Sequence, residues 1–99
     1  MIFEIAHLQI KPATHSAFEA AVAEAVPLFK RAQGCLSMRL ERSIEHSDNY
    51  RLVVGWETLD NHMVDFRGSA DFQEWRRLVG DFFAGAPQVE HMDTVLNCF

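Results

Sequence analysis

The sequence has few cysteines, and it lacks any long apolar run. Its 99 residues include two cysteines, Cys35 and Cys98, which lie far apart and form no CxxC motif. Such a pair is neither a disulfide framework nor a zinc or redox motif, so we expect two reduced thiols. No apolar run approaches the about 20 residues of a membrane span, and the N-terminus lacks the basic region of a signal peptide. We therefore expect a soluble, cytoplasmic protein that does not bind a membrane.

Basic residues are also scarce. Nine Lys and Arg against fourteen Asp and Glu give a formal net charge of −5. The basic residues do not gather into the stripe that nucleic acid or an anionic membrane requires. The sequence also lacks a glycine-rich phosphate loop, a GxSxG elbow and an HExxH helix. Nucleic acid is therefore not an expected partner, and the common motifs of nucleotide-binding, serine hydrolase and zinc protease sites are absent.

The hydrophobic pattern, by contrast, is rich and regular. Hydrophobic residues make up 48% of the chain and charged residues 23%, as in ordinary globular proteins, and the length suits one domain over residues 1–99. Apolar residues recur with a helical period from Phe18 to Phe29, with Ser16 or Thr14 as the cap and a kink at Pro27. The predicted elements are a strand over 2–11, this helix, strands over 35–45 and 50–58, helices over 59–67 and from 69 to near 85, and a strand over 89–97. This order, βαββαβ, predicts an α+β ferredoxin-like fold with a four-stranded antiparallel sheet.

Several predicted strands are apolar on both faces. The first strand carries Phe3 and Ile5 on one face and Ile2, Ala6, Leu8 and Ile10 on the other. The helices of such a fold cover one face of the sheet, and a chain of this length has no further element for the second face. A second copy of the chain is the simplest cover, so we expect a homodimer.

The chain resembles the antibiotic biosynthesis monooxygenase (ABM) domain over residues 2–95. The resemblance rests on Gly34-Cys35-Leu36, on Val54 to Leu59 with His62 and Phe66 after it, on Ser69 to Phe72, and on Val89-Glu90-His91. It implies a dimeric α/β barrel with a pocket between the sheet and the helices. Characterised relatives include monooxygenases that oxidise phenolic or quinol compounds with dioxygen and without metal or flavin, and haem-degrading enzymes. The haem-degrading branch depends on residues that are replaced here by Ala6, Phe66 and Arg76.

The resemblance therefore implies a cofactor-independent monooxygenase for a small aromatic, phenolic or quinol compound, with no cofactor. Such chemistry needs a base and hydrogen-bond donors in an aromatic-walled cavity. A neutral imidazole can accept the proton, so His7, His62 and His91 are all candidates, and His62 also falls where the family commonly carries histidine. Arg39 could bind a phenolate or pair with a glutamate of its hairpin. The catalytic candidates are His62, Arg39 and His7, and the substrate-binding candidates are Trp56, Phe66, Trp75, Phe72 and His91.

Other interpretations stay open at this point. His91 and Asp93 are the one pair of potential metal ligands that alternate along a strand. A single pair of this kind is usually solvated, so no metal site is expected. The aromatic residues could be core rather than cavity wall. The main alternative function is a non-catalytic small-molecule-binding or structural dimeric module, which a cavity filled by Trp56, Trp75 and Met38 would favour. An isomerase or ring-cleaving activity without dioxygen is a third possibility.

Overall fold

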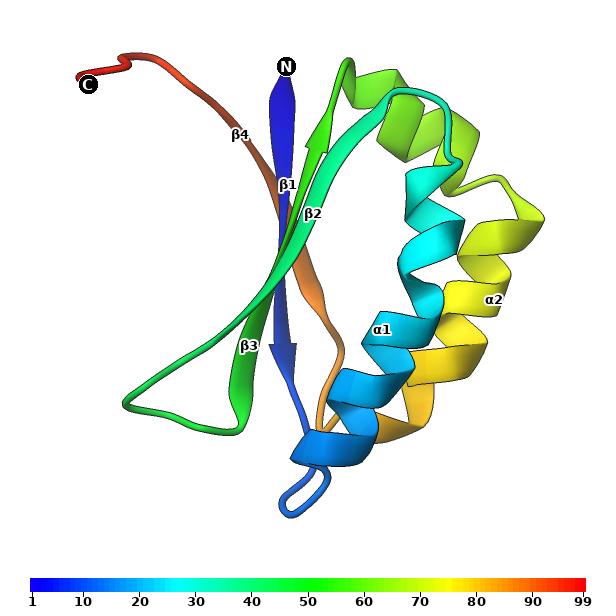
Figure 1. The fold of residues 1–99 in the computed structure, drawn as a ribbon, viewed down its shortest axis with the longest axis vertical. Coiled ribbons are helices and arrows are strands. Elements are labelled where there is room, and N and C mark those ends of the chain that lie inside the picture. The colour runs from blue at the N-terminus through cyan, green and yellow to red at the C-terminus, as the bar shows by residue number, and fades with distance from the viewer.

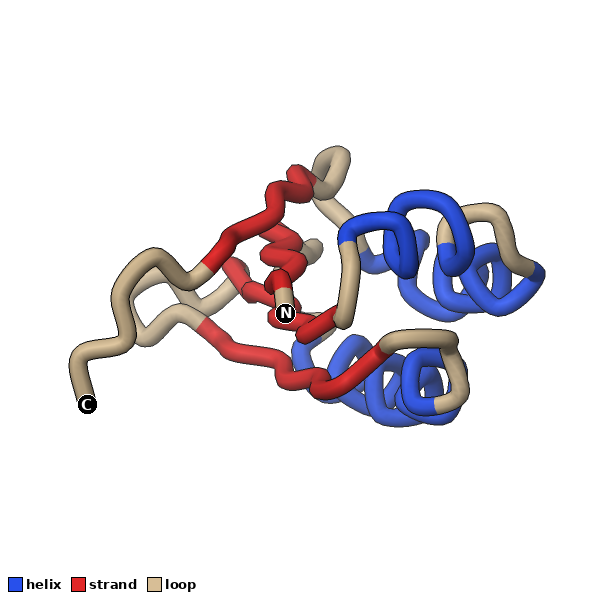
Figure 2. The backbone as a smooth tube through the Cα atoms, turned by 90° about the horizontal axis from the view of Figure 1, so that it is seen from above, coloured by secondary structure: helices blue, strands red, loops and turns tan.

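A computed structural model describes residues 1–99 as a four-stranded antiparallel sheet with helices on one face (Figures 1 and 2). The elements are β1 (Ile2–Gln9), α1 (His15–Lys30), β2 (Cys35–Arg42), β3 (Asn49–Trp56), the π-helical turn η1 (Asn61–Phe66), α2 (Ala70–Val79), the 3₁₀ turn η2 (Gly80–Phe82) and β4 (Gln88–Asp93). The predicted ferredoxin-like βαββαβ fold is thereby confirmed. None of the helices is both long enough and apolar enough to cross a lipid bilayer.

The sheet has the strand order β2-β3-β1-β4. The central strand β1 pairs with β3 from Ile2↔Trp56 to Gln9↔Asn49, and with β4 from Ile2↔Asp93 to His7↔Gln88. Successive side chains of a strand point to opposite faces, so residues of equal parity along β1 share a face. The even positions of β1 face the helices, where Ala6 and Leu8 are buried.

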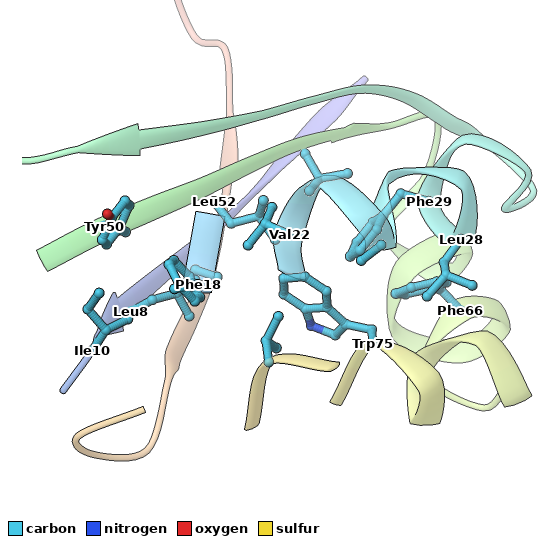
Figure 3. Close-up of a cluster of buried hydrophobic side chains, with 14 of the residues drawn as sticks. Leu8, Ile10, Phe18, Val22, Leu28, Phe29, Tyr50, Leu52, Phe66 and Trp75 are labelled. Carbon is cyan, nitrogen blue, oxygen red and sulfur yellow. The ribbon is translucent and has the colours of Figure 1, made fainter. Parts of the chain in front are cut away.

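The hydrophobic core lies between this inner face and the two long helices (Figure 3). On the sheet side, the core contains Leu52 and the other even positions of β3. On the helix side, α1 contributes Phe18, Val22 and Phe29. Phe29 contacts Trp75 of α2 edge to face, with ring centroids 5.1 Å apart. The helical stripes predicted from the sequence therefore do cover the sheet.

Several predicted boundaries differ from the structure. The capping box at Ser16 is wrong, because α1 begins at His15 after Thr14, whose Oγ1 donates to the carbonyl of Lys11. The last strand is shorter than predicted and comprises Gln88–Asp93. By contrast, Ser69 caps α2 as expected, since its Oγ accepts a hydrogen bond from the backbone N–H of Phe72.

The turn η1 is held in place by a close approach to the loop before β2. Gly34 has a φ of 76°, and a Cβ atom there would lie 2.1 Å from Oδ1 of Asn61. The same amide oxygen accepts hydrogen bonds from the backbone N–H and the hydroxyl of Thr58. This arrangement places His62, the next residue along, beneath the end of the sheet.

The outer face of the sheet, away from the helices, is mixed in character. Phe3 and Ile5 are half-buried, Val53 is buried and Met92 is half-exposed. Charged and polar residues lie among them, namely His7, Arg39, Glu41, Arg51 and Glu90. The predicted apolar strip on this face exists, but ion pairs border it, such as Arg51 with Glu41.

Candidate functional site

A cleft of about 840 Å³ lies between α2 and the strands β1 and β4. It forms where α2 leaves the inner face at the β4 edge partly uncovered. Trp75 and Val79 of α2 form one wall, and Ala6, Leu8 and Val89 form the other. The cleft is open rather than filled, so it has the volume to hold a small aromatic compound.

The carboxyl of Glu4 lies at the floor of this cleft. Glu4 occupies an even position of β1, and the strand therefore turns it inward among apolar residues, with 5% of its surface exposed. The indole Nε1 of Trp56 donates a hydrogen bond of 3.0 Å to Oε1 of Glu4. Burial raises the pKa of the Glu4 carboxyl to about 7, and the Trp56 hydrogen bond and the Arg67 charge oppose this rise. The carboxyl can therefore both take and release a proton near neutral pH.

His62 lies between Glu4 and His91. Its Nε2 is 3.2 Å from Oε1 of Glu4, and its Nδ1 shares a hydrogen bond of 2.8 Å with Nε2 of His91. The imidazole is stacked on the indole of Trp56, with ring centroids 5.3 Å apart. Burial, with smaller effects of His91 and Arg67, lowers the pKa of His62 to about 4. His62 is therefore neutral at pH 7.

The neutral ring of His62 can carry its proton on either nitrogen. When Glu4 is ionised, the proton on Nε2 faces the carboxylate, and Nδ1 accepts from His91. When Glu4 is protonated, the proton on Nδ1 faces His91 instead, and Nε2 can accept from the carboxyl. Glu4, His62 and His91 thus form one chain of direct contacts. Nowhere in the protein do three or more His, Cys, Asp or Glu side chains cluster in a way that could hold a metal ion.

The mouth of the cleft carries arginines from two elements. The guanidinium carbons of Arg67 and Arg76 lie 5.7 Å and 5.9 Å from the ring centroid of Phe72. Neither arginine forms an ion pair with a carboxylate, whereas Arg77, further along α2, is paired with Glu74. The mouth therefore presents two unneutralised positive charges in a chain that is acidic overall.

The structure gathers most of the predicted site residues around the cleft. His62, Phe72 and Trp75 line it. Trp56 and Phe66 are buried behind His62 rather than in the wall, and the rings of all three are in contact. His91 contacts His62 from β4 and is not part of the wall.

Arg39 and His7 are not brought together with His62. Both occupy positions on the outer face, because His7 is odd in β1 and Arg39 pairs with Val53 across the hairpin. Arg39 Nε donates to Glu41 at 3.0 Å, and His7 Nε2 lies 3.2 Å from Glu90. The prediction that they share a pocket with His62 is thus corrected by the alternation of side chains along the strands.

Sequence reasoning missed Glu4, Arg67 and Arg76. The available signal for Glu4 was its parity, since it is the one charged residue among the even, apolar positions of the first strand. The two arginines gave no such signal, because an exposed helical arginine is the ordinary case in a soluble protein.

Comparison with known proteins adds the family. Residues 1–78 match the family described as "Antibiotic biosynthesis monooxygenase". The uncharacterised protein YczJ of Bacillus subtilis is 38% identical over 95 residues, which cover 96% of this chain and all of that protein. A crystal structure of a candidate antibiotic biosynthesis monooxygenase from Bordetella bronchiseptica is 60% identical, with a TM-score of 0.94 over 96% of this chain and 97% of that one. SnoaB from Streptomyces nogalater, a cofactor-independent oxygenase, has a TM-score of 0.82 at 14% identity, over 97% of this chain and 94% of that one, and so shares the fold.

Proposed function

Because the chain belongs to the antibiotic biosynthesis monooxygenase family, we propose that it is a cofactor-independent monooxygenase of a small aromatic, phenolic or quinol compound. The observation that carries the proposal is the buried Glu4 carboxyl, which shares the floor of an open cleft with His62. SnoaB, described as a cofactor-independent oxygenase, supports it by its fold.

Glu4 is the proposed base. A phenol must lose its proton before it can pass an electron to dioxygen, and a base with a pKa near 7 is suited to this step. The contacts from Trp56 and His62 both end on Oε1 of Glu4, and Oε2 makes no hydrogen bond within the chain. Oε2 is therefore free to accept the hydrogen of a substrate hydroxyl.

His62 and His91 give that proton a way out. A proton on Glu4 can move to Nε2 of His62 while the proton on Nδ1 passes to His91 along their hydrogen bond of 2.8 Å. His91 is partly exposed, so its second ring nitrogen can exchange with solvent. His62 thus returns Glu4 to its ionised form without becoming a buried cation.

The oxidation itself draws all its electrons from the substrate. The deprotonated ring passes an electron to dioxygen, the two radicals combine at a ring carbon, and the O–O bond then breaks. One oxygen atom stays on the carbon as a carbonyl, and the other leaves as water. That water takes the hydrogen of the ring carbon and the proton that the hydroxyl gave to the base, so a phenol becomes a quinone. Trp75 and Phe72 would hold the ring flat in the cleft and exclude water from it.

We also propose that a second copy of the chain covers the outer face. Ile5 and Met92 leave apolar surface there, and no element of the same chain covers it. The paired charges beside the strip, such as Arg39 with Glu41, fit the polar rim of an interface.

Oxygen uptake tests the proposed activity. The purified protein, treated with a chelator, is given a panel of phenols and quinols in an oxygen electrode. We expect uptake that falls by a factor on the order of 100 in Glu4→Gln and in His62→Gln. Arg42→Gln is the control, because Arg42 lies outside the cleft and contacts Glu19.

Two results would contradict the proposal in different ways. Uptake that needs added metal or flavin would reject the cofactor-independent mechanism. Normal uptake in Glu4→Gln with loss in Arg39→Gln would move the chemistry to the outer face. Tight binding of a phenol without any uptake would instead favour the alternative, a non-catalytic binding module.

A further inference from the structure

No carboxylate of the protein pairs with the two arginines at the mouth of the cleft. Arg67 follows η1 directly, and its backbone N–H donates to the carbonyl of His62, so the site fixes its position. Its side chain contacts the sulfur of Met63 and the face of Phe72, while Arg76 lies against the same ring from α2. Both guanidinium groups lie over the same aromatic ring and both line the cleft, so positive charge is concentrated beside Phe72.

The charges of the cleft do not balance. Arg67 and Arg76 contribute two positive charges, Arg77 is neutralised by Glu74, and the one acidic group in the wall is Glu4. With Glu4 ionised, the cleft therefore carries one net positive charge. A ligand with a single negative charge would neutralise the cleft, and a guanidinium fork matches the geometry of a carboxylate.

From this arrangement we propose that the substrate is an aromatic carboxylate: its carboxylate binds Arg67 and Arg76 at the mouth, and its ionisable hydroxyl points to Glu4 at the floor. This inference rests on the proposed function for the role of the hydroxyl, but the carboxylate contact concerns binding alone. The cleft volume of about 840 Å³ suits a ring system, and Phe72 and Trp75 line the cleft and would lie against its faces.

The same contacts would also assist the proton transfer. When the hydroxyl gives its proton to Glu4, the carboxyl becomes neutral and the ligand carries two negative charges. The cleft then holds two positive charges against two negative ones, so the arginines stabilise the deprotonated ligand more than the ligand that entered. Of the two arginines, Arg67 is the one whose charge lowers the pKa values of Glu4, His62 and His91.

A matched pair of probes tests this inference without turnover. Binding of 6-hydroxy-2-naphthoate and of 2-naphthol is measured by fluorescence titration in the absence of oxygen. We expect the carboxylate to bind tighter by a factor on the order of ten in the wild-type protein. In the double variant Arg67→Gln/Arg76→Gln that preference should disappear, and in Arg42→Gln, which removes a charge outside the cleft, it should stay.

Thermal unfolding of each variant confirms that it is folded before binding is compared. Equal binding of the two probes, binding of neither, or an undiminished preference in the double variant would each overturn the inference. A preference that falls equally in Arg42→Gln would overturn it too, because it would reflect net charge rather than the mouth. Carboxylate-selective binding without oxygen uptake would leave this inference standing and reject the monooxygenase proposal, so the two can fail separately.

Discussion

The indole N–H of Trp56 donates a hydrogen bond of 3.0 Å to the carboxyl of Glu4, from the end of β3 to the neighbouring strand β1. Trp56 is fully buried, and its ring is also stacked on His62. One rigid side chain therefore contacts both the carboxyl and the imidazole, and its N–H lowers the pKa of Glu4 against the larger effect of burial.

Replacing Trp56 with Phe should raise the pKa of Glu4 above its value of about 7. The variant keeps an aromatic ring beside His62 but removes a donor that favours the ionised carboxyl. A hydrogen bond to a charged group is worth about 1.5–3 kcal/mol, which corresponds to a rise of roughly one to two pKa units. Titration of the Glu4 carboxyl carbon by NMR measures it. Trp75→Phe is the control, since Trp75 does not donate to Glu4, and an unchanged pKa in Trp56→Phe would contradict the assignment.

Replacing Glu4 with Gln should change how stability depends on pH. The pKa of Glu4 is raised from 4.5 to about 7 on folding, so its contribution to stability is complete below about pH 4.5 and is lost as pH rises through 7. The Gln variant lacks this loss. Its free energy of unfolding, relative to wild type, should therefore improve by up to about 3 kcal/mol between acidic and mildly alkaline pH. Urea denaturation across that range measures the difference, and a flat difference would show that Glu4 is not held near pKa 7.

Replacing His62 with Gln should give the opposite pH trend. The pKa of His62 is lowered from 6.5 to about 4 on folding, so its contribution is complete above pH 6.5 and is lost as pH falls through 4. Relative to wild type, the variant should therefore gain stability toward acidic pH rather than toward alkaline pH. The same urea series measures this. Parallel trends for His62→Gln and Glu4→Gln would mean that the two groups titrate as one unit.

The fold could be predicted from the sequence because its signals are periodic. The alternation in the strands and the stripe from Phe18 to Phe29 survive in the structure, since burial of a whole face determines them. The capping box at Ser16 failed because a cap depends on one side-chain geometry, and Thr14 ends the preceding loop instead. Helices and strands that a repeating pattern determines were predictable, and features that depend on the geometry of one side chain were less so.

The site was predictable only in part, for the same reason. His62 was identified by its position in the family pattern, and it lies in the cleft. Arg39 and His7 were chosen by residue type, although the alternation along the strands puts His7 on the face of Phe3 and Ile5 and Arg39 on the less apolar face of its strand. The parity of Glu4 marked it as inward, but its contact with Trp56 joins residues 52 positions apart and depends on the register of β1 with β3.

Replacing Gly34 with Ala should destabilise the protein. Gly34 has a φ of 76°, and the added Cβ would meet Oδ1 of Asn61 at 2.1 Å. The backbone strain alone costs about 1–3 kcal/mol, and the contact adds to it. Chemical denaturation measures the loss. Gly80→Ala is the matched control, because nothing lies within 4 Å of a Cβ there and the backbone is helical, so its stability should stay within about 0.5 kcal/mol of wild type.

The double variant Gly34→Ala/Asn61→Ala should lose less stability than the sum of the losses in the two single variants. Removal of the Asn61 amide relieves the steric contact, although it also removes the hydrogen bonds to Thr58. Strict additivity would show that the loop before β2 and the turn η1 do not press on each other.

Replacing Ile5 with Arg should dissociate the proposed dimer. Ile5 lies at the middle of the outer face, opposite Val53, and a second copy would bury it. In a symmetric dimer each chain would bury one added guanidinium in the interface, close to Arg39 of the same chain. The loss of hydration of both charges would oppose association. Analytical ultracentrifugation should give a dimer for the wild type and a monomer for the variant at micromolar concentration. Ile44→Arg is the control, since Ile44 is 93% exposed at the β2–β3 turn and should leave the dimer intact. A wild-type protein that sediments as a monomer would contradict the proposed dimer. The cleft would then be a site within a single chain.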